Sequence, residues 1–428
     1  MRRRRGSGAV NPVGERAPDS AARTRSPRDY RLLFGAFVVS TAGDWLYKLA
    51  LPLLVLHLTG SAVQTAVVYS LEYVPYLLFA LVGGVLSDRY DRRLLLVGAD
   101  LTAAGVVGLL AVAAWFGEHH LWLIYPAAFA LSSITPLYQA TFQAMVPGTV
   151  PADRLSRANS RMQAGQGVLD LAGPLLGAGA VAALGATWAL SLDSASFALS
   201  ALAVALIAHT RVPRPPREHV TVLGDLKEAV AFVRAHPPLL WGAIVATGSG
   251  FGLFMVEANM ITYLVRFREQ PVAAVGVVFA ALGTGSLLGA LATPRLLARV
   301  TPGRLIIGAT ATGGGATALL LVSTGLPAIA ATWVLVGAST TIFIVTFFTL
   351  RHQLVPEHLL GRVVVITRLI AFGAVPFAPL VGGALLSATG AFWPVLALSA
   401  AVQVGVAVAA LFTPLRVVAE PARPAEQN

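Results

Sequence analysis

The sequence contains no cysteine among its 428 residues, and it carries little charge of either sign. Without cysteine, disulfide bridges and thiolate metal sites are excluded. Charged residues make up 12% of the chain, about half of the roughly 25% that is usual in soluble domains. So little charge cannot cover a water-facing surface, which excludes an ordinary soluble protein.

Apolar residues are abundant instead, at 56% of the chain with a mean hydropathy of +0.73. They form runs of about 20 residues, the length of a helix that crosses a bilayer. Lipid-exposed backbone must satisfy its own hydrogen bonds, and the runs lack the period-two alternation of barrel strands. The sequence therefore predicts an all-α membrane protein of twelve transmembrane helices. The predicted spans are 31–56, 63–86, 94–116, 121–146, 160–182, 187–208, 239–264, 272–296, 304–324, 327–350, 363–387 and 392–413.

The basic residues are distributed unevenly between the predicted loops. Of 31 Lys and Arg residues, 28 fall in the two tails, in the loops on one predicted side with the central loop included, or at the ends of the predicted spans next to them. Positive residues mark the cytoplasmic side of a membrane protein. We therefore expect both termini in the cytoplasm and a multi-pass protein of the cell membrane, in contact with lipid. The net charge of +11 is spread over short loops, which argues against nucleic acid as a partner.

The chain divides into two similar halves. Segment 173–177 matches 378–382, and segment 145–147 matches 354–356, offsets of 205 and 209 residues. Parallel repeats around a central site are a transporter design, so a nonconducting receptor is disfavoured. The expected parts are a disordered basic arm (1–30), a six-helix bundle (31–208), a cytoplasmic central loop (209–238), a second six-helix bundle (239–413) and a cytoplasmic tail (414–428).

The central loop contains a short amphipathic pattern, with Leu226, Val230 and Val233 at helical spacing. Such a helix can lie on the cytoplasmic membrane surface. The alternative interpretation is a plain linker.

The most specific motif is the decapeptide Gly-Val-Leu-Ser-Asp-Arg-Tyr-Asp-Arg-Arg at residues 84–93. It resembles the signature loop of the major facilitator superfamily, with Asp91 where that signature usually has Gly. The resemblance implies the major facilitator fold, with a central cavity between the halves. It also implies that the loop holds the halves together on the cytoplasmic side, its Asp lying near the start of helix 11. The gating residues implied are Gly84, Asp88, Arg89, Arg92 and Arg93.

Helix 5 carries Gly173, Pro174 and Gly177, which resemble the Gly-Pro motif of antiporters in this superfamily, without its upstream glycine. Segments 43–45, 155–159 and 193–197 are similar to the macrolide-efflux-like branch of drug exporters. Helix 4 lacks the intramembrane Arg of many proton-coupled drug exporters. The resemblance implies efflux of drug-like molecules by an antiporter.

Ionisable residues at membrane depth are costly and are candidates for function. A carboxyl group in apolar surroundings tends to hold a proton, as a proton carrier requires. The proton-coupling candidates are Asp44, Lys48, Glu72, Asp170 and Glu257. A structural pair between Asp44 and Lys48, with Glu72 completing its network, is the competing interpretation. Asp193 is interpreted as a residue that ties helix ends together near the outer surface.

By the same resemblance, helices 1, 4, 7 and 10 line the substrate cavity. Their aromatic residues suit amphiphilic, aromatic or cationic molecules. The predicted lining residues are Tyr47, Tyr138, Gln139, Phe142, Phe251, Phe254, Phe343 and Phe347.

The function expected is therefore export of small amphiphilic molecules of drug or macrolide type by proton antiport through alternating access. We expect a monomer powered by the proton gradient, without cofactor or metal. The alternatives are a siderophore or metabolite exporter, or an importer, on the same fold. A membrane-embedded enzyme is disfavoured because no H-E-x-x-H or comparable spacing occurs.

Overall fold

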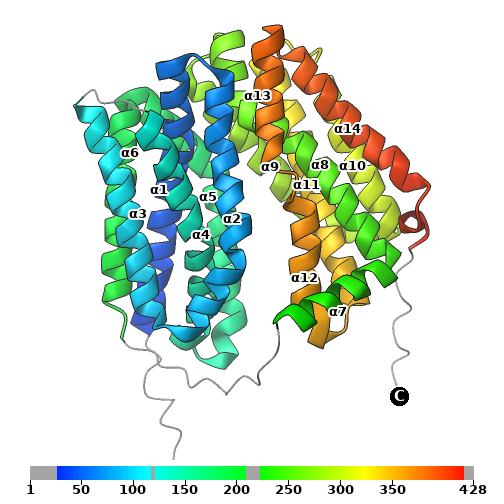
Figure 1. The fold of residues 1–428 in the computed structure, drawn as a ribbon, viewed down its shortest axis with the longest axis horizontal. Helices are drawn as coiled ribbons and strands as arrows, with labels where there is room; N and C mark the ends of the chain where they lie inside the picture. The colour runs from blue at the N-terminus through cyan, green and yellow to red at the C-terminus, as the bar shows by residue number, and fades with distance from the viewer. Residues whose placement is uncertain (1–26, 117–120, 209–221, 419–428) are drawn as a thin grey trace, which may run out of the picture.

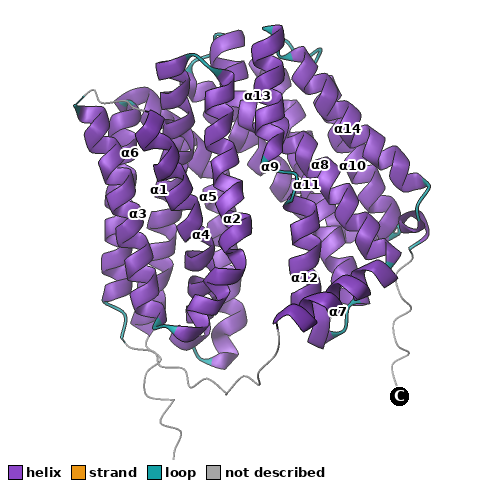
Figure 2. Ribbon diagram, in the orientation of Figure 1, coloured by secondary structure: helices purple, strands orange, loops and turns teal. Residues whose placement is uncertain are grey.

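The computed structural model describes residues 27–116, 121–208 and 222–418. Most of the expected basic arm and of the expected tail lie outside these residues. The described chain is helical and contains no strand (Figure 2). The first half comprises α1 (Pro27–Thr59), α2 (Ala62–Arg89), α3 (Arg92–Trp115), α4 (Leu121–Thr149), α5 (Leu155–Leu184) and α6 (Ala186–Ala205).

The second half follows a short helix, α7 (Val222–Ala235). Its helices are α8 (Pro237–Thr262), α9 (Val272–Leu297), α10 (Pro302–Leu319), α11 (Leu326–Leu354), α12 (Glu357–Phe372), α13 (Phe377–Thr389) and α14 (Trp393–Leu411). A π-helical turn, Tyr263–Phe267, continues α8. Short 3₁₀ turns occupy Ala152–Arg154 and Pro414–Val417.

Within the described residues, nine spans are long and apolar enough to cross a membrane, the pair α12 and α13 counting as one. Helices α2, α4 and α10, with 28, 29 and 18 residues, complete the set. At a rise of about 1.5 Å per residue, even an 18-residue helix extends roughly 27 Å. The predicted twelve-helix architecture is therefore confirmed.

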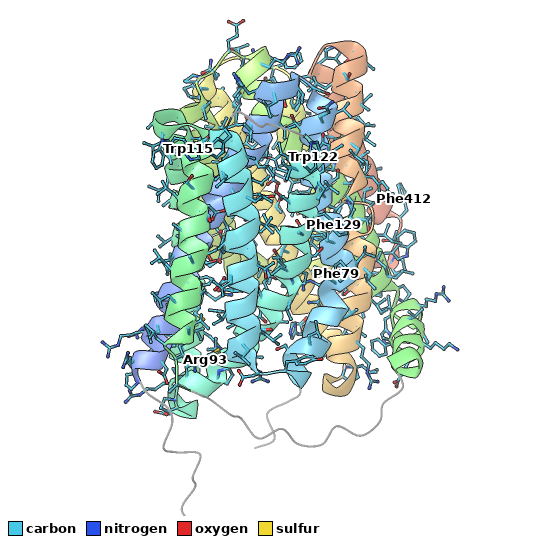
Figure 3. The ribbon with its side chains drawn as sticks, turned by 60° about the vertical axis from the view of Figure 1, so that its left-hand side comes forward. Phe79, Arg93, Trp115, Trp122, Phe129 and Phe412 are labelled. Carbon is cyan, nitrogen blue, oxygen red and sulfur yellow. The ribbon has the colours of Figure 1, made fainter. Side chains whose placement is uncertain are left out.

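The two halves stand side by side and diverge toward one end (Figure 1). We call the end that holds α7 and the turn Tyr90–Asp91 the terminal end, and the opposite end the distal end. Trp115 and Trp122 lie toward the distal end, whereas Arg93 lies at the terminal end (Figure 3). Trp188 and Trp393, at the distal starts of α6 and α14, are likewise exposed. Exposed tryptophans at one level are typical of a membrane interface.

Close contacts between the halves lie at the distal end and at mid-depth. Helix α13 packs on α2 and α9 packs on α5. Arg266 donates a hydrogen bond to the carbonyl of Gly60 across the distal end. Helix α4 packs against α1, α2, α3 and α5 of its own half, α11 packs against α9 and α10, and the halves diverge toward the terminal end (Figure 1). The structure is thus closed distally and splayed at the terminal end.

The eleventh span differs from the continuous helix expected at 363–387. It consists of two helices, because turns at 373–376 separate α12 from α13. Pro376 and Pro379 lie at this junction, and proline interrupts the hydrogen bonding of a helix. The distal part α13 packs against α2 and α8, while the terminal part α12 packs against α7 and α8.

Helix α7 covers the segment of the expected amphipathic pattern and packs on α12 of the second half. Its apolar residues Ala229 and Val233 are buried against Leu359 and Val363 of α12. An ion pair of 3.0 Å between Glu228 and Arg362 borders this contact. Ala229 and Val233 therefore pack on α12, which offers a matching apolar surface, and a position of α7 on the membrane surface stays a prediction.

Candidate functional site

Five carboxyl groups lie around a single ammonium group in the middle of the bundle. Lys48 of α1 is exposed, and its Nζ lies 5.0 Å from the ring centroid of Trp45. In the described part of the chain, no ion pair joins Lys48 to Asp44. Its charge nevertheless acts on the carboxyls of Asp44, Glu72, Asp170, Asp193 and Glu257. All five sequence candidates are thus linked electrostatically through Lys48, and Asp193 joins them.

Two of these carboxyls belong to different halves and interact electrostatically. The charge of Glu257 of α8 acts on Glu72 of α2, and both charges act on Tyr69 and Tyr73. The ring of Tyr73 packs edge-on against Phe254 of α8, with centroids 4.9 Å apart. Oε1 of Glu72 is buried and has no hydrogen-bond partner among the described residues. This contact can therefore sense the protonation of either glutamate.

The side chain of Asp170 on α5 is exposed. Gln166, one turn earlier, donates a hydrogen bond of 2.7 Å to its Oδ1. The Asp170 backbone carbonyl lies against Gly283 of α9, where a β-carbon would approach it to 2.7 Å. Asp170 therefore lies at the contact between the halves.

The Gly-Pro segment of α5 makes close contacts on two sides. A β-carbon on Gly173 would overlap the Trp45 ring, and one on Gly177 would lie 2.6 Å from the Trp45 carbonyl oxygen. On the other side, the Pro174 carbonyl oxygen would lie 2.7 Å from a β-carbon on Gly276 of α9. Small residues thus let α5 approach both α1 and the second half. The antiporter role of the segment stays a prediction.

The signature loop begins at the terminal end of α2, which carries Gly84, Asp88 and Arg89. The side chains of Asp88 and Arg89 are not among those that the structure describes. Asp91 caps α3, accepting hydrogen bonds from the backbone N–H groups of Arg93 at 2.9 Å and Leu94 at 3.3 Å. Carboxylates at the first turn of a helix stabilise its exposed N–H groups. This capping explains an aspartate at the position usually occupied by glycine.

The two arginines after Asp91 bind neighbouring helices of their own half. Arg92 donates a hydrogen bond of 2.7 Å to the Ala144 carbonyl of α4, and Arg93 donates one to the Ala205 carbonyl of α6. Both bonds fix α3 at the terminal end. The proposed contact of this loop with helix 11 stays a prediction.

A cavity of about 740 Å³ opens at the terminal start of α5. Nearby on α4, Gln139 and Gln143 are exposed although they lie in a spanning helix. Polar side chains at this depth are rare against lipid and are typical of water-filled cavities. The cavity is lined by Leu155, Ser156, Asn159, Ser160 and Gln163.

Several predicted cavity aromatics lie elsewhere. Phe142 belongs to the apolar core of the first half and Phe343 and Phe347 to that of the second, each at most 7% exposed. Phe347 fits against Gly242 of α8. Sequence spacing identified their helices but not the faces that pack inward.

The other predicted aromatics are partly buried or lack a partner for their polar groups. Phe251 and Phe254 are partly buried on α8 and pack against the central core. Tyr138 stacks on Phe142 with centroids 5.9 Å apart. The Tyr47 and Tyr138 hydroxyls are buried without a hydrogen-bond partner among the described residues.

Sequence reasoning missed Asp100 of α3 and misplaced Asp193 of α6. Asp100 is 1% exposed and accepts a hydrogen bond of 2.7 Å from the Ser200 hydroxyl of α6. A lone acid in an apolar run was the available signal for Asp100. Asp193 is 0% exposed and faces α1 at Gly43 rather than tying helix ends.

Relatives with curated names cover most of the chain. It is 28% identical over 349 residues to the enterobactin exporter EntS of Salmonella typhimurium, covering 78% of this chain and 80% of that protein. It is 27% identical over 376 residues to the multidrug efflux pump Tap of Mycolicibacterium fortuitum, covering 86% of this chain and 91% of that protein. These relatives are transporters by name.

Solved structures show the same fold at low identity. A bacterial homologue of the iron transporter ferroportin, in an inward-facing state, aligns with a TM-score of 0.70 and 17% identity, over 90% of this chain and 98% of that one. The nucleoside transporter NupG aligns with a TM-score of 0.76 and 14% identity, over 90% and 99%. Residues 33–372 match the Major Facilitator Superfamily. The chain therefore belongs to the Major Facilitator Superfamily and is a multi-pass membrane transporter.

Proposed function

We propose that the protein is a proton-driven exporter of small amphiphilic molecules in the cell membrane. The observation that carries this proposal is the group of carboxyls from both halves around Lys48. Glu72 and Glu257 repel one another when both are ionised and do not when one is protonated. Proton binding therefore changes the energy of the contact between the halves, which is the requirement for coupling protons to alternating access.

In this proposal the terminal end faces the cytoplasm, because 28 of 31 basic residues belong to its loops and tails. The splayed terminal end then admits substrate from the cytoplasm. Protons enter from the outside when the distal contacts open. The membrane potential contributes about 2.3 kcal/mol per charge per 100 mV to this inward movement.

The walls around the cluster suit an amphiphilic substrate. Gln139 and Gln143 offer hydrogen bonds on α4, while Phe251 and Phe254 offer apolar surface on α8. Sites of this kind bind molecules with an apolar body and few polar groups. Similarity to a multidrug efflux pump supports the same class. Gating by the signature loop and antiport through the Gly-Pro segment are parts of this proposal.

Siderophore export is the second candidate, favoured by the similarity to the enterobactin exporter. The exposed amides on α4 and α5, including Gln139 and Gln163, also suit a substrate with many polar groups. Enterobactin is therefore included as a test substrate beside the hydrophobic compounds.

The test uses purified protein in liposomes with ethidium, tetraphenylphosphonium or enterobactin inside. An imposed proton gradient is expected to drive transport, and an uncoupler to stop it. Glu72→Gln and Glu257→Gln should each lower gradient-driven transport at least tenfold, while Asp153→Asn, an exposed carboxyl outside the cluster, leaves it unchanged. A transport rate that is the same with and without the proton gradient, and the same in wild type and both glutamate variants, contradicts the proposal.

Asp44→Asn separates proton carriage from pairing with Lys48. If Asp44 carries the proton, the variant loses gradient-driven transport but retains exchange of substrate across the membrane. If Asp44 only balances Lys48, expression falls, because the Lys48 charge is then left unbalanced within a membrane-spanning helix, where a charge is costly. Adding Lys48→Met then restores expression. A fully coupled double variant assigns proton carriage to the other carboxyls.

The orientation has its own test in reporter fusions. Fusions after residues 60, 118 and 326 should report the outside, and fusions after 92, 215 and 300 the inside. An outside signal from the fusion at 215 contradicts a cytoplasmic terminal end.

A further inference from the structure

Arg268 follows the π-helical turn that continues α8, and the transport scheme above gives it no role. Within the described ranges, Arg266 and Arg268 are the two Lys or Arg residues at the distal end. Arg266 donates its hydrogen bond across the halves, whereas the side-chain hydrogen bonds of Arg268 lie within the second half. Arg268 therefore stands apart from the basic residues that mark the terminal end.

The π-helical turn and two side-chain hydrogen bonds hold the guanidinium in place. The backbone N–H of Arg268 donates a bond of 3.0 Å to the carbonyl of Tyr263, five residues earlier. Its Nε donates one of 2.7 Å to the Tyr263 hydroxyl, and its Nη2 donates one of 2.8 Å to the Ser323 carbonyl. A guanidinium has five N–H donors, so the remaining ones are available to a ligand. The cation is thus fixed in position before any ligand arrives.

A pocket of about 240 Å³ lies at this site, inside the second half. Its walls come from the π-helical turn, the end of α10 and the start of α14. Tyr263 stacks on Phe392 with ring centroids 4.2 Å apart, which joins two of these walls. Arg268 is the one charged residue among the described residues that line the pocket, and it forms no ion pair with the described chain. The pocket therefore combines a cation that lacks an acidic partner with apolar and aromatic walls.

The pocket lies at the level of the membrane interface. Trp393, one of its lining residues, is 64% exposed, and exposed tryptophans mark this level at the distal end. Helices α10 and α14 pack side by side and lead from the pocket toward the terminal end (Figure 1). They carry the exposed side chains of Leu319 and Leu398. A molecule bound in the pocket can therefore extend along an apolar surface in the membrane.

The size of the pocket excludes a large ligand in its interior. Sites that enclose a drug-sized molecule have volumes of roughly 300–1,000 Å³, and this pocket is smaller. The guanidinium of Arg268 suits a phosphate, to which arginine donates short, charge-assisted hydrogen bonds. The start of α14 adds the partial positive charge of a helix N-terminus. The described lining contains no acid that could accept an ammonium group.

We propose that this pocket binds the headgroup of an anionic phospholipid from the leaflet at the distal end. The phosphate accepts hydrogen bonds from Arg268, and the acyl chains lie outside the pocket along α10 and α14. A net negative headgroup is preferred to a zwitterionic one, because the lining balances the phosphate but offers nothing to an ammonium. The bound lipid joins the π-helical turn to α14 within one half. The site is therefore independent of the proposed export and of its coupling to protons.

Native mass spectrometry of the purified full-length protein in detergent counts bound lipids and needs no transported substrate. The protein is titrated with phosphatidylglycerol or with phosphatidylethanolamine that has the same acyl chains. We expect one phosphatidylglycerol to bind at least tenfold more tightly than phosphatidylethanolamine. Arg268→Gln should lower this affinity at least tenfold. Arg266→Gln removes the same charge two residues earlier, outside the pocket lining, and should leave the affinity unchanged.

A second pair of variants leaves the hydrogen bonds of Arg268 intact. Leu321 lines the pocket and is 42% exposed, so a polar side chain is tolerated there. Leu321→Glu places a carboxylate in the pocket wall, whereas Leu321→Gln has nearly the same shape without the charge. We expect Leu321→Glu to bind phosphatidylglycerol at least tenfold more weakly than Leu321→Gln, because like charges repel. This comparison tests the site when Arg268→Gln does not fold.

A phosphatidylglycerol with a photoreactive headgroup locates the bound lipid, and crosslinking should label the peptides of the π-helical turn and of the start of α14. Equal affinities of Leu321→Glu and Leu321→Gln overturn the inference, as does labelling confined to other peptides. Phosphatidylethanolamine that binds as tightly as phosphatidylglycerol overturns the preference for an anionic headgroup. Glycerol 1-phosphate that binds as tightly as the lipid shows that the pocket takes a free phosphate ester and overturns the lipid site.

Discussion

At the distal end, Gly383 of α13 fits against the first turns of α2. A β-carbon on Gly383 would lie 2.9 Å from the β-carbon of Ala66, 3.1 Å from the carbonyl oxygen of Ala62 and 3.2 Å from the α-carbon of Val63. Two of these three atoms are backbone, so the neighbours cannot rotate away. Gly383→Val therefore overpacks a contact that holds the distal end closed, at a typical cost of about 1–3 kcal/mol.

This cost applies to the distally closed state alone, since the clash is relieved when the halves separate there. A difference of about 1–3 kcal/mol changes the ratio of two conformations roughly 5- to 150-fold. Because the chain contains no cysteine, spin labels can be attached to single introduced cysteines. Labels at exposed Asn159 of α5 and Gln353 of α11 report the width of the opening at the terminal end. Pulsed electron paramagnetic resonance should show a shorter distance between the two labels in Gly383→Val than in the wild type.

Gly405→Val on α14 is the matched control, because a β-carbon on Gly405 meets no heavy atom within 4 Å. It should leave the distance distribution as in the wild type. A folded Gly383→Val protein with an unchanged distribution would refute the idea that this contact closes the distal end.

Three further perturbations test other contacts. Arg266→Gln removes the hydrogen bond across the distal end and should shift the same spin-label distance in the same direction, by less than Gly383→Val, because an exposed hydrogen bond contributes only about 0.5–1.5 kcal/mol. Gly173→Leu places a side chain into the Trp45 ring and should lower the thermal unfolding temperature. Gly179→Leu on the same helix meets open space and should leave that temperature unchanged. Equal unfolding temperatures of the two variants would contradict the packing of Gly173 on Trp45. Ala229→Asp buries an unpaired carboxylate against α12 and should speed hydrogen exchange of the backbone amides throughout α7. Unchanged exchange rates would contradict the packing of α7 on α12.

The sequence alone determined the architecture and the depth of the charged residues. A spanning helix needs about 20 apolar residues whatever its neighbours are, so the twelve spans could be located from local composition. The same reasoning found Glu72 and Glu257, since any ionisable residue within such a span is conspicuous. It also located the Gly-Pro segment of α5, whose small residues form close contacts with α1 and α9.

Only the tertiary structure decided which side chains meet. Glu72 and Glu257 are 185 positions apart in the sequence, and their charges interact because α2 packs beside α8, where Tyr73 meets Phe254. Phe142, Phe343 and Phe347 lie on predicted cavity helices, yet they turn into the cores of their halves. A uniformly apolar helix carries little amphipathic signal, so its sequence does not tell which face meets protein, lipid or cavity. For the same reason Asp193, which the sequence places only at a depth, lies against Gly43 because α1 packs on α6.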